Sequence, residues 1–291
     1  MIAPSSAGGP VDLSARPVSH AFGEVLGQQI VVDNRAGAAG LIGAETVATA
    51  TPDGYTLLFA FSGPLVIVPH LGGQTPYNTL KDFAPVSLVA QAPYVLLVHP
   101  SVPANSVKEL IALAKARPGK LNFASGGNGT GIHLAGELFK LTAGVDIVHV
   151  PYKGAGPGQT ALLANEVDMM FNGLPPALPH LKSGKLKALA VGGATRSALL
   201  PEMPTIAESG LAFNTTGWYG VLAPRATSRA IIGKLHAATV KTLTAPALKE
   251  SLARQGVETV GSTPEAFATL IRDEWSKWEK VIKAAGLKTQ Q

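Results

Sequence analysis

The sequence contains no cysteine, which excludes disulfide bonds, thiolate metal sites and a thiol nucleophile. Aromatic residues make up only 6% of the chain and charged residues 15%, whereas hydrophobic residues make up 46%. This hydrophobic content argues against intrinsic disorder. The length of 291 residues is sufficient for two domains with buried cores.

An uninterrupted membrane-spanning run is also missing. The most apolar stretch, YTLLFAFSGPLVIVPHL at residues 55–71, reaches only the lower edge of spanning length, and Gly63 and Pro64 interrupt it. We therefore predict a strand, a turn and a second strand here rather than a membrane helix. Met1 is followed directly by IAPSS, without a charged and then apolar signal region, so these residues predict no export signal.

Signatures of nucleic-acid binding and of catalysis are missing as well. The net charge is +5, but the 24 lysine and arginine residues are scattered and form no basic patch with interleaved aromatic residues, which argues against a nucleic-acid partner. The sequence has neither a G-x-S-x-G elbow nor an H-E-x-x-H motif. We therefore expect no catalytic residue, no metal and no cofactor.

The chain does contain a regular alternation of short strands and helices. Strands are expected at residues 30–34, 55–61, 94–100, 121–125, 145–152, 167–173 and 186–192. Helices are expected at 39–49, from 107 behind a Ser106 cap, from 132 to Gly144, and at 159–165. Strands that alternate with short helices predict an α/β fold with mostly parallel sheets.

The last predicted helix has the clearest pattern. Thr263 provides the cap, Pro264 takes the first helical position, and one face is apolar. That face comprises Phe267, Leu270, Ile271, Trp275, Trp278 and Ile282. We interpret it as a packing helix whose tryptophans belong to the core.

Three loops share the order of strand, glycine-rich turn and helix, namely SSAGGPVD, RAGAAGLIG and SGGNGTGIH. A helix start leaves N–H groups unpaired and carries a partial positive charge, so such a loop suits an anion. GGNGTGIH has Ile132 and His133 where a P-loop requires Lys and Ser/Thr, which disfavours phosphate. Neutral donors suffice for a single charge, so a carboxylate is favoured. Gly37, Gly40 and Gly43 do not fit the dinucleotide pattern, and we expect them to allow close helix–strand packing.

Polar residues near these loops have two interpretations each. Asp12 orients a ligand amine or a bound water, or it is a first-turn acid that interacts favourably with the helix dipole. His133 and Glu137 lie one helical turn apart, but two ligands do not make a metal site, so His133 is interpreted as a first-turn residue near the cleft. Asp168 contacts ligand or simply ends a strand.

Several segments resemble, in order and in spacing, the solute-binding receptors of tripartite tricarboxylate transporters, also known as the Bug family. These segments are GGPVDLSAR, VVDNRAGAAGLIGAE, TPDGYTLL, DFAPVSLVA, GTGIHLAGELF, HVPYKGAGPGQTALLANEVDMMF, LKALAVGGATR, LPEMPTIAESG and GWYGVLAP. The resemblance extends from about residue 4 to the C-terminal helix.

This resemblance implies the type II periplasmic-binding-protein fold, in which two crossing strands join two α/β lobes and the ligand cleft lies between the lobes. Lobe one would comprise residues 1–95 and 219–291, and lobe two residues 96–218, with crossovers near 93–97 and 218–223. The implied function is a monomeric periplasmic receptor that closes on a small organic carboxylate and delivers it to a membrane permease. A carboxylate sensor that signals through a membrane kinase is the alternative.

The resemblance also implies a set of ligand-binding residues. By position they are Ser6, Ala7, Gly8, Gly9, Asp12, Phe61, Ser62, Gly127, Asn128, Thr130, His133 and Asn172. The chain departs from the family at Ser5, Ser6 and Ala7, where an aromatic residue and a proline are usual, and at Ala36, where proline is common. Phe61 and the absence of arginine from the loops SSAGGPVD and SGGNGTGIH favour a mono- or dicarboxylate over citrate, with aromatic and amino-acid-like acids included.

Overall fold

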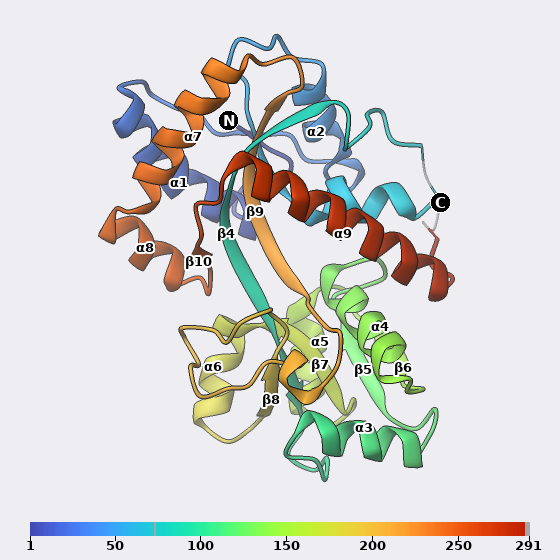
Figure 1. Ribbon diagram of the computed structural model, residues 1–291. Helices are drawn as coiled ribbons and strands as arrows, with labels where there is room; N and C mark the ends of the chain where they lie inside the picture. The colour runs from blue at the N-terminus through green and yellow to red at the C-terminus, as the bar shows by residue number, and fades with distance from the viewer. Residues whose placement is uncertain (73, 289–291) are drawn as a thin grey trace. The chain divides into compact units, whose positions relative to one another are not determined.

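The computed structural model describes residues 1–72 and 74–288, which form two compact units. Unit 1 comprises Met1–Gln91 and Trp218–Lys280 together with Lys288, and unit 2 comprises Ala92–Gly217 and Val281–Leu287. The chain passes from one unit to the other within two long strands, β4 (Phe83–Val98) and β9 (Thr216–Pro224), both labelled in Figure 1. Strands and helices alternate in each unit, which confirms the α/β class.

The sheet of unit 1 is mixed. β1 (Ile2–Ala3) pairs in parallel with β2 (Asp33–Asn34) and with β3 (Leu58–Phe61). β3 pairs with β9 in the antiparallel direction, and β10 (Glu258–Thr259) pairs with β4 in the same manner. The prediction of mostly parallel sheets is therefore wrong, because the strands that connect the units run against their neighbours.

Helices cover this sheet. The helices of unit 1 are α1 (Pro10–Leu26), α2 (Leu41–Ala48), α7 (Arg229–Leu243), α8 (Pro246–Ala253) and α9 (Pro264–Ala284), and short turns lie at η1 (Ala38–Gly40), η2 (Gly63–Ile67) and η3 (Val68–His70). α1 packs against α7 and α8, as Figure 1 shows. α9 begins where the sequence predicts, since Thr263 Oγ1 accepts from the Ala266 N–H at 3.2 Å. Phe267, which lies edge-on to Trp218, and Trp278 are buried as predicted, whereas Trp275 is only half-buried and does not belong to the core.

The predicted second strand within residues 55–71 is wrong, because η2 and η3 occupy it. Pro64 stands in the first turn of η2, where its missing N–H is tolerated, and the apolar side chains that follow are buried. The Tyr77 hydroxyl donates to the Pro64 carbonyl and the Thr79 hydroxyl to the Leu65 carbonyl, each at 2.7 Å. Side chains thus satisfy backbone groups that a strand would pair. Among the described residues, no helix has both the length and the apolar character needed to cross a bilayer.

Unit 2 is built around a second sheet. β5 (Asn122–Ser125) lies parallel to β6 (Val148–Pro151) and β7 (Met169–Gly173), while β4 is antiparallel to β7 and to β8 (Lys187–Val191). Its helices are α3 (Val107–Ala116), α4 (Gly131–Ala143), α5 (Ala155–Leu163) and α6 (Leu174–Lys182), with a short turn at η4 (Ala207–Ser209). Ser106 Oγ accepts from the Glu109 N–H at 3.2 Å, which confirms the predicted cap.

The topology places the glycine-rich loops at one edge of each sheet. β5, β6 and β7 run in the same direction, and α4, α5 and α6 begin directly after their carboxyl ends. In unit 1, α1, α2 and η2 follow the carboxyl ends of the parallel strands β1, β2 and β3. Each unit therefore gathers several helix starts, with their unpaired N–H groups, along a single edge.

Candidate functional site

The loop between β1 and α1 offers open backbone donors in unit 1. Gly8 has φ 77°, a left-handed conformation that favours glycine, and Gly9 caps α1 without a side-chain hydrogen bond. Ser6, Ala7 and Gly8 are exposed. Within residues 1–72 and 74–288, no protein group accepts from the N–H of Ser6 or of Ala7. These two N–H groups and the Ser6 hydroxyl are therefore available to an anion.

Asp12 lies behind this loop and holds it in place. Its carboxylate is only 2% exposed and accepts from the Gly8 N–H at 2.8 Å, from Arg16 Nε at 3.0 Å and from Asn34 Nδ2 at 2.9 Å. Burial acts to raise the pKa of Asp12, but the hydrogen bonds from Arg16, Gly8 and Asn34 and the charge of Arg16 outweigh it, so the pKa is lowered. Asp12 is thus more than a dipole residue, since its oxygens fix the loop and neutralise Arg16.

Phe61 and Ser62 follow at the end of β3, where the chain enters η2. The Phe61 ring covers Gly63 so closely that a Cβ on this glycine would lie 2.5 Å from the ring. Ser62 is half-buried, and its hydroxyl makes no capping bond to η2. The structure therefore leaves the Ser62 hydroxyl available beside an aromatic surface.

The loop from Gly126 to Thr130 is closed by its own hydrogen bonds in unit 2. Thr130 Oγ1 donates to the Gly127 carbonyl at 2.8 Å and accepts from the His133 N–H at 3.3 Å. The Gly127 N–H donates to Ser125 Oγ at 3.0 Å. Asn128 lies exposed at the tip. Most of the backbone is therefore committed internally, whereas the Asn128 amide is presented outward.

His133 supports this loop from behind. The ring is 1% exposed, its Nδ1 accepts from the Gly129 N–H at 3.0 Å, and its Nε2 faces Glu137 Oε1 at 3.7 Å. Burial acts to raise the pKa of Glu137, but His133 and Lys140 outweigh it and lower that pKa. Among the described residues, no three histidine, aspartate or glutamate side chains group so that they could hold a metal ion.

Asn172 and Asp168 lie at opposite ends of β7. Asn172 is 3% exposed, and its Nδ2 donates to Gln159 Oε1 at 2.6 Å while its Oδ1 accepts from the Gly173 N–H. It therefore ties β7 to α5 at the edge where the loops lie. Asp168 Oδ2 accepts from the Asn122 N–H at 2.7 Å, at the starts of β5 and β7. This position supports the interpretation of Asp168 as a strand-terminal residue, since it precedes β7 at the end opposite the glycine loops of unit 2.

Four residues that hold the predicted site residues in place were not predicted from the sequence. Asn34, Gln159, Ser125 and His149 all bond to the loops or to their supports. Asn34 and Ser125 end their strands immediately before a glycine-rich turn, which is a signal that could have found them. His149 and Gln159 lie inside β6 and α5, and nothing in their local sequence separates them from core residues.

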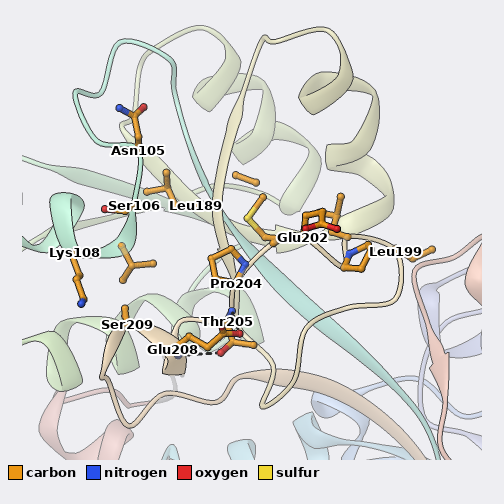
Figure 2. A pocket seen from close by; sticks show the side chains of 15 residues that line it. Asn105, Ser106, Lys108, Leu189, Leu199, Glu202, Pro204, Thr205, Glu208 and Ser209 are labelled. Carbon is orange, nitrogen blue, oxygen red and sulfur yellow. Dashed lines mark hydrogen bonds between the residues drawn. The ribbon is translucent and has the colours of Figure 1, made fainter.

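A separate cavity of about 590 Å³ lies elsewhere in unit 2. Figure 2 shows Ser106 and Lys108 from the start of α3 and Leu189 from β8 facing Pro204 and Glu208 across it. Glu208 forms a two-pronged ion pair with Arg196, at 3.0 and 2.7 Å. No residue of the glycine loops lines this cavity. Its lining carries a positive charge on Lys108 and a negative charge on Glu202. The cavity therefore differs from the glycine loops, whose available donors are neutral N–H and hydroxyl groups.

Comparison with known proteins identifies relatives of the whole chain. The family model described as "Tripartite tricarboxylate transporter family receptor" matches residues 14–287. A UPF0065 protein from the tcbD-tcbE intergenic region of Pseudomonas sp. strain P51 is 40% identical over 292 residues, covering 100% of this chain and 87% of the relative. Protein BugT of Bordetella pertussis is 40% identical over 290 residues, covering 99% and 89%.

Solved structures of periplasmic binding proteins are also similar to the whole chain. One described as a periplasmic transporter superposes with a TM-score of 0.78 at 38% identity, covering 99% of this chain and 96% of the other. Rpa4515 of R. palustris with adipate has a TM-score of 0.78 at 35% identity, with coverages of 99% and 96%. MatC of Rhodopseudomonas palustris with bound malate has a TM-score of 0.75 at 33% identity, with coverages of 97% and 97%. The two-lobe fold predicted from sequence is thereby confirmed.

Proposed function

Because the chain belongs to the receptor family of tripartite tricarboxylate transporters, we propose that it captures a small organic carboxylate in the periplasm and delivers it to a tripartite membrane permease. The family and the solved neighbours are solute-binding proteins rather than enzymes, and they imply a periplasmic location. The proposed function is therefore the binding and release of a carboxylate, without a covalent reaction.

The observation that carries this proposal is the kind of donor at the loops. The Ser6 and Ala7 N–H groups are open at the start of α1, and the nearby charge of Arg16 is neutralised by Asp12. Neutral donors at a helix start stabilise a single negative charge without strong attraction for a polyanion. A carboxylate group fits this donor set better than a phosphate or a citrate does.

The two liganded relatives indicate which acids to try first. Rpa4515 was solved with adipate and MatC with malate, and both ligands are dicarboxylates. We propose a mono- or dicarboxylate for this chain, with aromatic and amino-acid-like acids included because Phe61 supplies an aromatic surface. Ser5 and Ser6 add hydroxyl groups where the family usually has apolar residues, which favours ligands with additional polar groups.

The proposed contacts are assigned unit by unit. In unit 1, direct contacts are proposed for Ser6, Ala7, Gly9, Phe61 and Ser62, with Gly8 and Asp12 shaping the loop. In unit 2, direct contacts are proposed for Asn128 and Thr130, with Gly127, His133 and Asn172 holding the loop in place. Gly8 and Gly127 are placed among the supporting residues because their N–H groups already donate to Asp12 and Ser125. Asp12, His133 and Asn172 are placed there because their side chains are buried and already hydrogen-bonded.

The test is a thermal-unfolding panel on protein freed of ligand by unfolding and refolding. Malate, adipate, glutamate and benzoate are added singly, and adipamide serves as an uncharged control of the same length as adipate. An acid present at 100 times its dissociation constant raises the free energy of unfolding by about 2.7 kcal/mol. We expect at least one acid to do so while adipamide does not. No shift with any acid, and no acid found bound by mass spectrometry of the purified protein, would contradict the proposal.

A further inference from the structure

A pair of stacked histidines lies directly beneath the glycine loop of unit 2. The His133 ring on α4 and the His149 ring on β6 are nearly parallel, with centroids 3.8 Å apart and 15° between their planes. Phe123 on β5 also contacts this pair, with its ring centroid 4.9 Å from that of His149 and 6.4 Å from that of His133. The three rings therefore form one aromatic cluster, in which the imidazole of His149 contacts both Phe123 and His133.

His133 contacts the loop directly through a hydrogen bond, and His149 contacts it through Ser125. His149 Nε2 lies 2.6 Å from Ser125 Oγ, and this hydroxyl accepts from the Gly127 N–H. His133 Nδ1 accepts from the Gly129 N–H. An imidazole nitrogen accepts a hydrogen bond only while it carries no proton, so protonation of His133 at Nδ1 removes the bond from Gly129. His133 thus fits this loop with an unprotonated Nδ1, and His149 is tied to the loop through the Ser125 hydroxyl.

Burial and neighbouring charges make protonation of His149 costly. Glu137 and Lys140, both on α4, are the charged side chains that face the histidine pair, and Glu137 pairs with His133 Nε2 and with Lys140. From β5, only the Phe123 ring and the Ser125 hydroxyl face His149. Burial is the largest cause that lowers the pKa of His149, from 6.5 to about 4, and the charge of Lys140 acts in the same direction against the opposing effect of Glu137.

We propose that His149, which lies outside the expected set of ligand contacts, is a positioning residue for the loop from Gly126 to Thr130, and that protonation of His149 releases this loop and weakens ligand binding. This inference rests on the proposed carboxylate-binding function. A histidine whose pKa is lower in the ordered loop than in an opened one favours the ordered loop above pH 6.5 and ceases to favour it as the pH falls towards 4.

The experiment measures malate and adipate affinity by calorimetry at pH 7.5 and pH 5.5 for the wild type and for His149→Gln. The dissociation constant of the wild type is expected to rise by about 3- to 10-fold at the lower pH. The upper limit of roughly tenfold follows if the pKa of His149 is near 4 in the ordered loop and near 6.5 in an opened loop. Glutamine can keep the bond to Ser125 but does not titrate, so His149→Gln should bind like the wild type at pH 7.5 with a clearly smaller pH effect. Protonation of the ligand itself affects both proteins equally.

Two further variants separate positioning from structural damage. His149→Phe keeps the stack but loses the bond to Ser125, and it should bind more weakly at both pH values. His20→Gln is the matched control, since His20 is 81% exposed in unit 1, and it should keep the wild-type pH dependence. If His149→Gln shows the full wild-type pH effect, the inference is wrong.

A second readout does not need a ligand. Hydrogen-exchange protection factors of the peptide that contains Gly127 and Gly129 are measured at both pH values in ligand-free protein. Protection should fall on acidification in the wild type and persist in His149→Gln, and an equal fall in both proteins overturns the inference. If neither acid binds the wild type at pH 7.5, the proposed function is contradicted for these acids, while the exchange data still decide the role of His149.

Discussion

Asp12→Ala is expected to weaken malate or adipate binding by at least about tenfold and to lower the free energy of unfolding by about 2 kcal/mol. The alanine removes the acceptor for the Gly8 N–H and leaves Arg16 and Asn34 without their shared partner. The loop that presents the Ser6 and Ala7 N–H groups then loses its anchor. Calorimetric titration and urea unfolding measure the two effects separately.

The two effects distinguish three roles for Asp12. A dipole residue alone would lower stability by less than about 1 kcal/mol and leave binding unchanged. A pure ligand contact would abolish binding and leave stability unchanged. Leu13→Ala is a suitable control because Leu13 is the next residue of α1 and is 50% exposed, and it should affect neither quantity strongly. Wild-type affinity and stability in Asp12→Ala would contradict the anchoring role.

The pH dependence of this stability difference follows from the lowered pKa of Asp12. A carboxyl group whose folded pKa lies below its unfolded value stabilises the fold only when it is ionised. The difference between the wild type and Asp12→Ala should therefore be fully present above about pH 3.8, the ordinary value, and be lost as the pH falls through the lower pKa of the folded protein. Unfolding measured in urea at several pH values from 7 to 3 provides the test.

The positions of the glycines made the loops predictable from the sequence. They did not predict which polar side chains of these loops point inward and which face solvent. The segments around Gly8, Gly37 and Gly127 read as strand, turn and helix start, and the structure has them so. Local sequence could not show that Asp12 and His133 turn inward, because their partners, Asn34 and His149, come from other strands. Tertiary contacts between strands decide which polar residue faces solvent.

The long connecting strand was also only partly predictable. The apolar run at residues 94–100 indicated its second half, but β4 begins at Phe83 and contains Pro85 and Pro93. Proline normally demotes a strand assignment because it removes a ladder donor. The error at residues 62–71 has a related origin, since side chains distant in sequence, Tyr77 and Thr79, satisfy the carbonyl groups there. In both cases the hydrogen-bonding partners of the backbone are brought close only by the folded structure, so the local sequence does not predict them.

Gly43→Ala is expected to lower the free energy of unfolding by about 2 kcal/mol, although alanine is normally the better helix former. A Cβ on Gly43 would lie 2.7 Å from Pro4 Cα and 2.9 Å from the Arg35 carbonyl oxygen. Both are backbone atoms, so no side-chain rotation relieves the overlap, and α2 must move away from the end of β1. This close approach confirms the expected tight packing for Gly43, whereas a Cβ on Gly37 would meet only the side chain of Ile42.

Gly233→Ala provides the matched control, because Gly233 also lies inside a helix, α7, but a Cβ there would meet nothing within 4 Å. We expect this variant to be more stable than the wild type by about 0.5–1 kcal/mol, through helix propensity and reduced freedom of the unfolded chain. Because Pro4 leads directly into the loop that begins at Ser5, Gly43→Ala should also weaken malate or adipate binding, whereas Gly233→Ala should not. Equal stability changes of the same sign in the two variants, measured by urea unfolding, would show that the contact with Pro4 does not constrain α2. Loss of stability in Gly43→Ala with unchanged affinity would instead separate the packing of α2 from the geometry of the ligand loop.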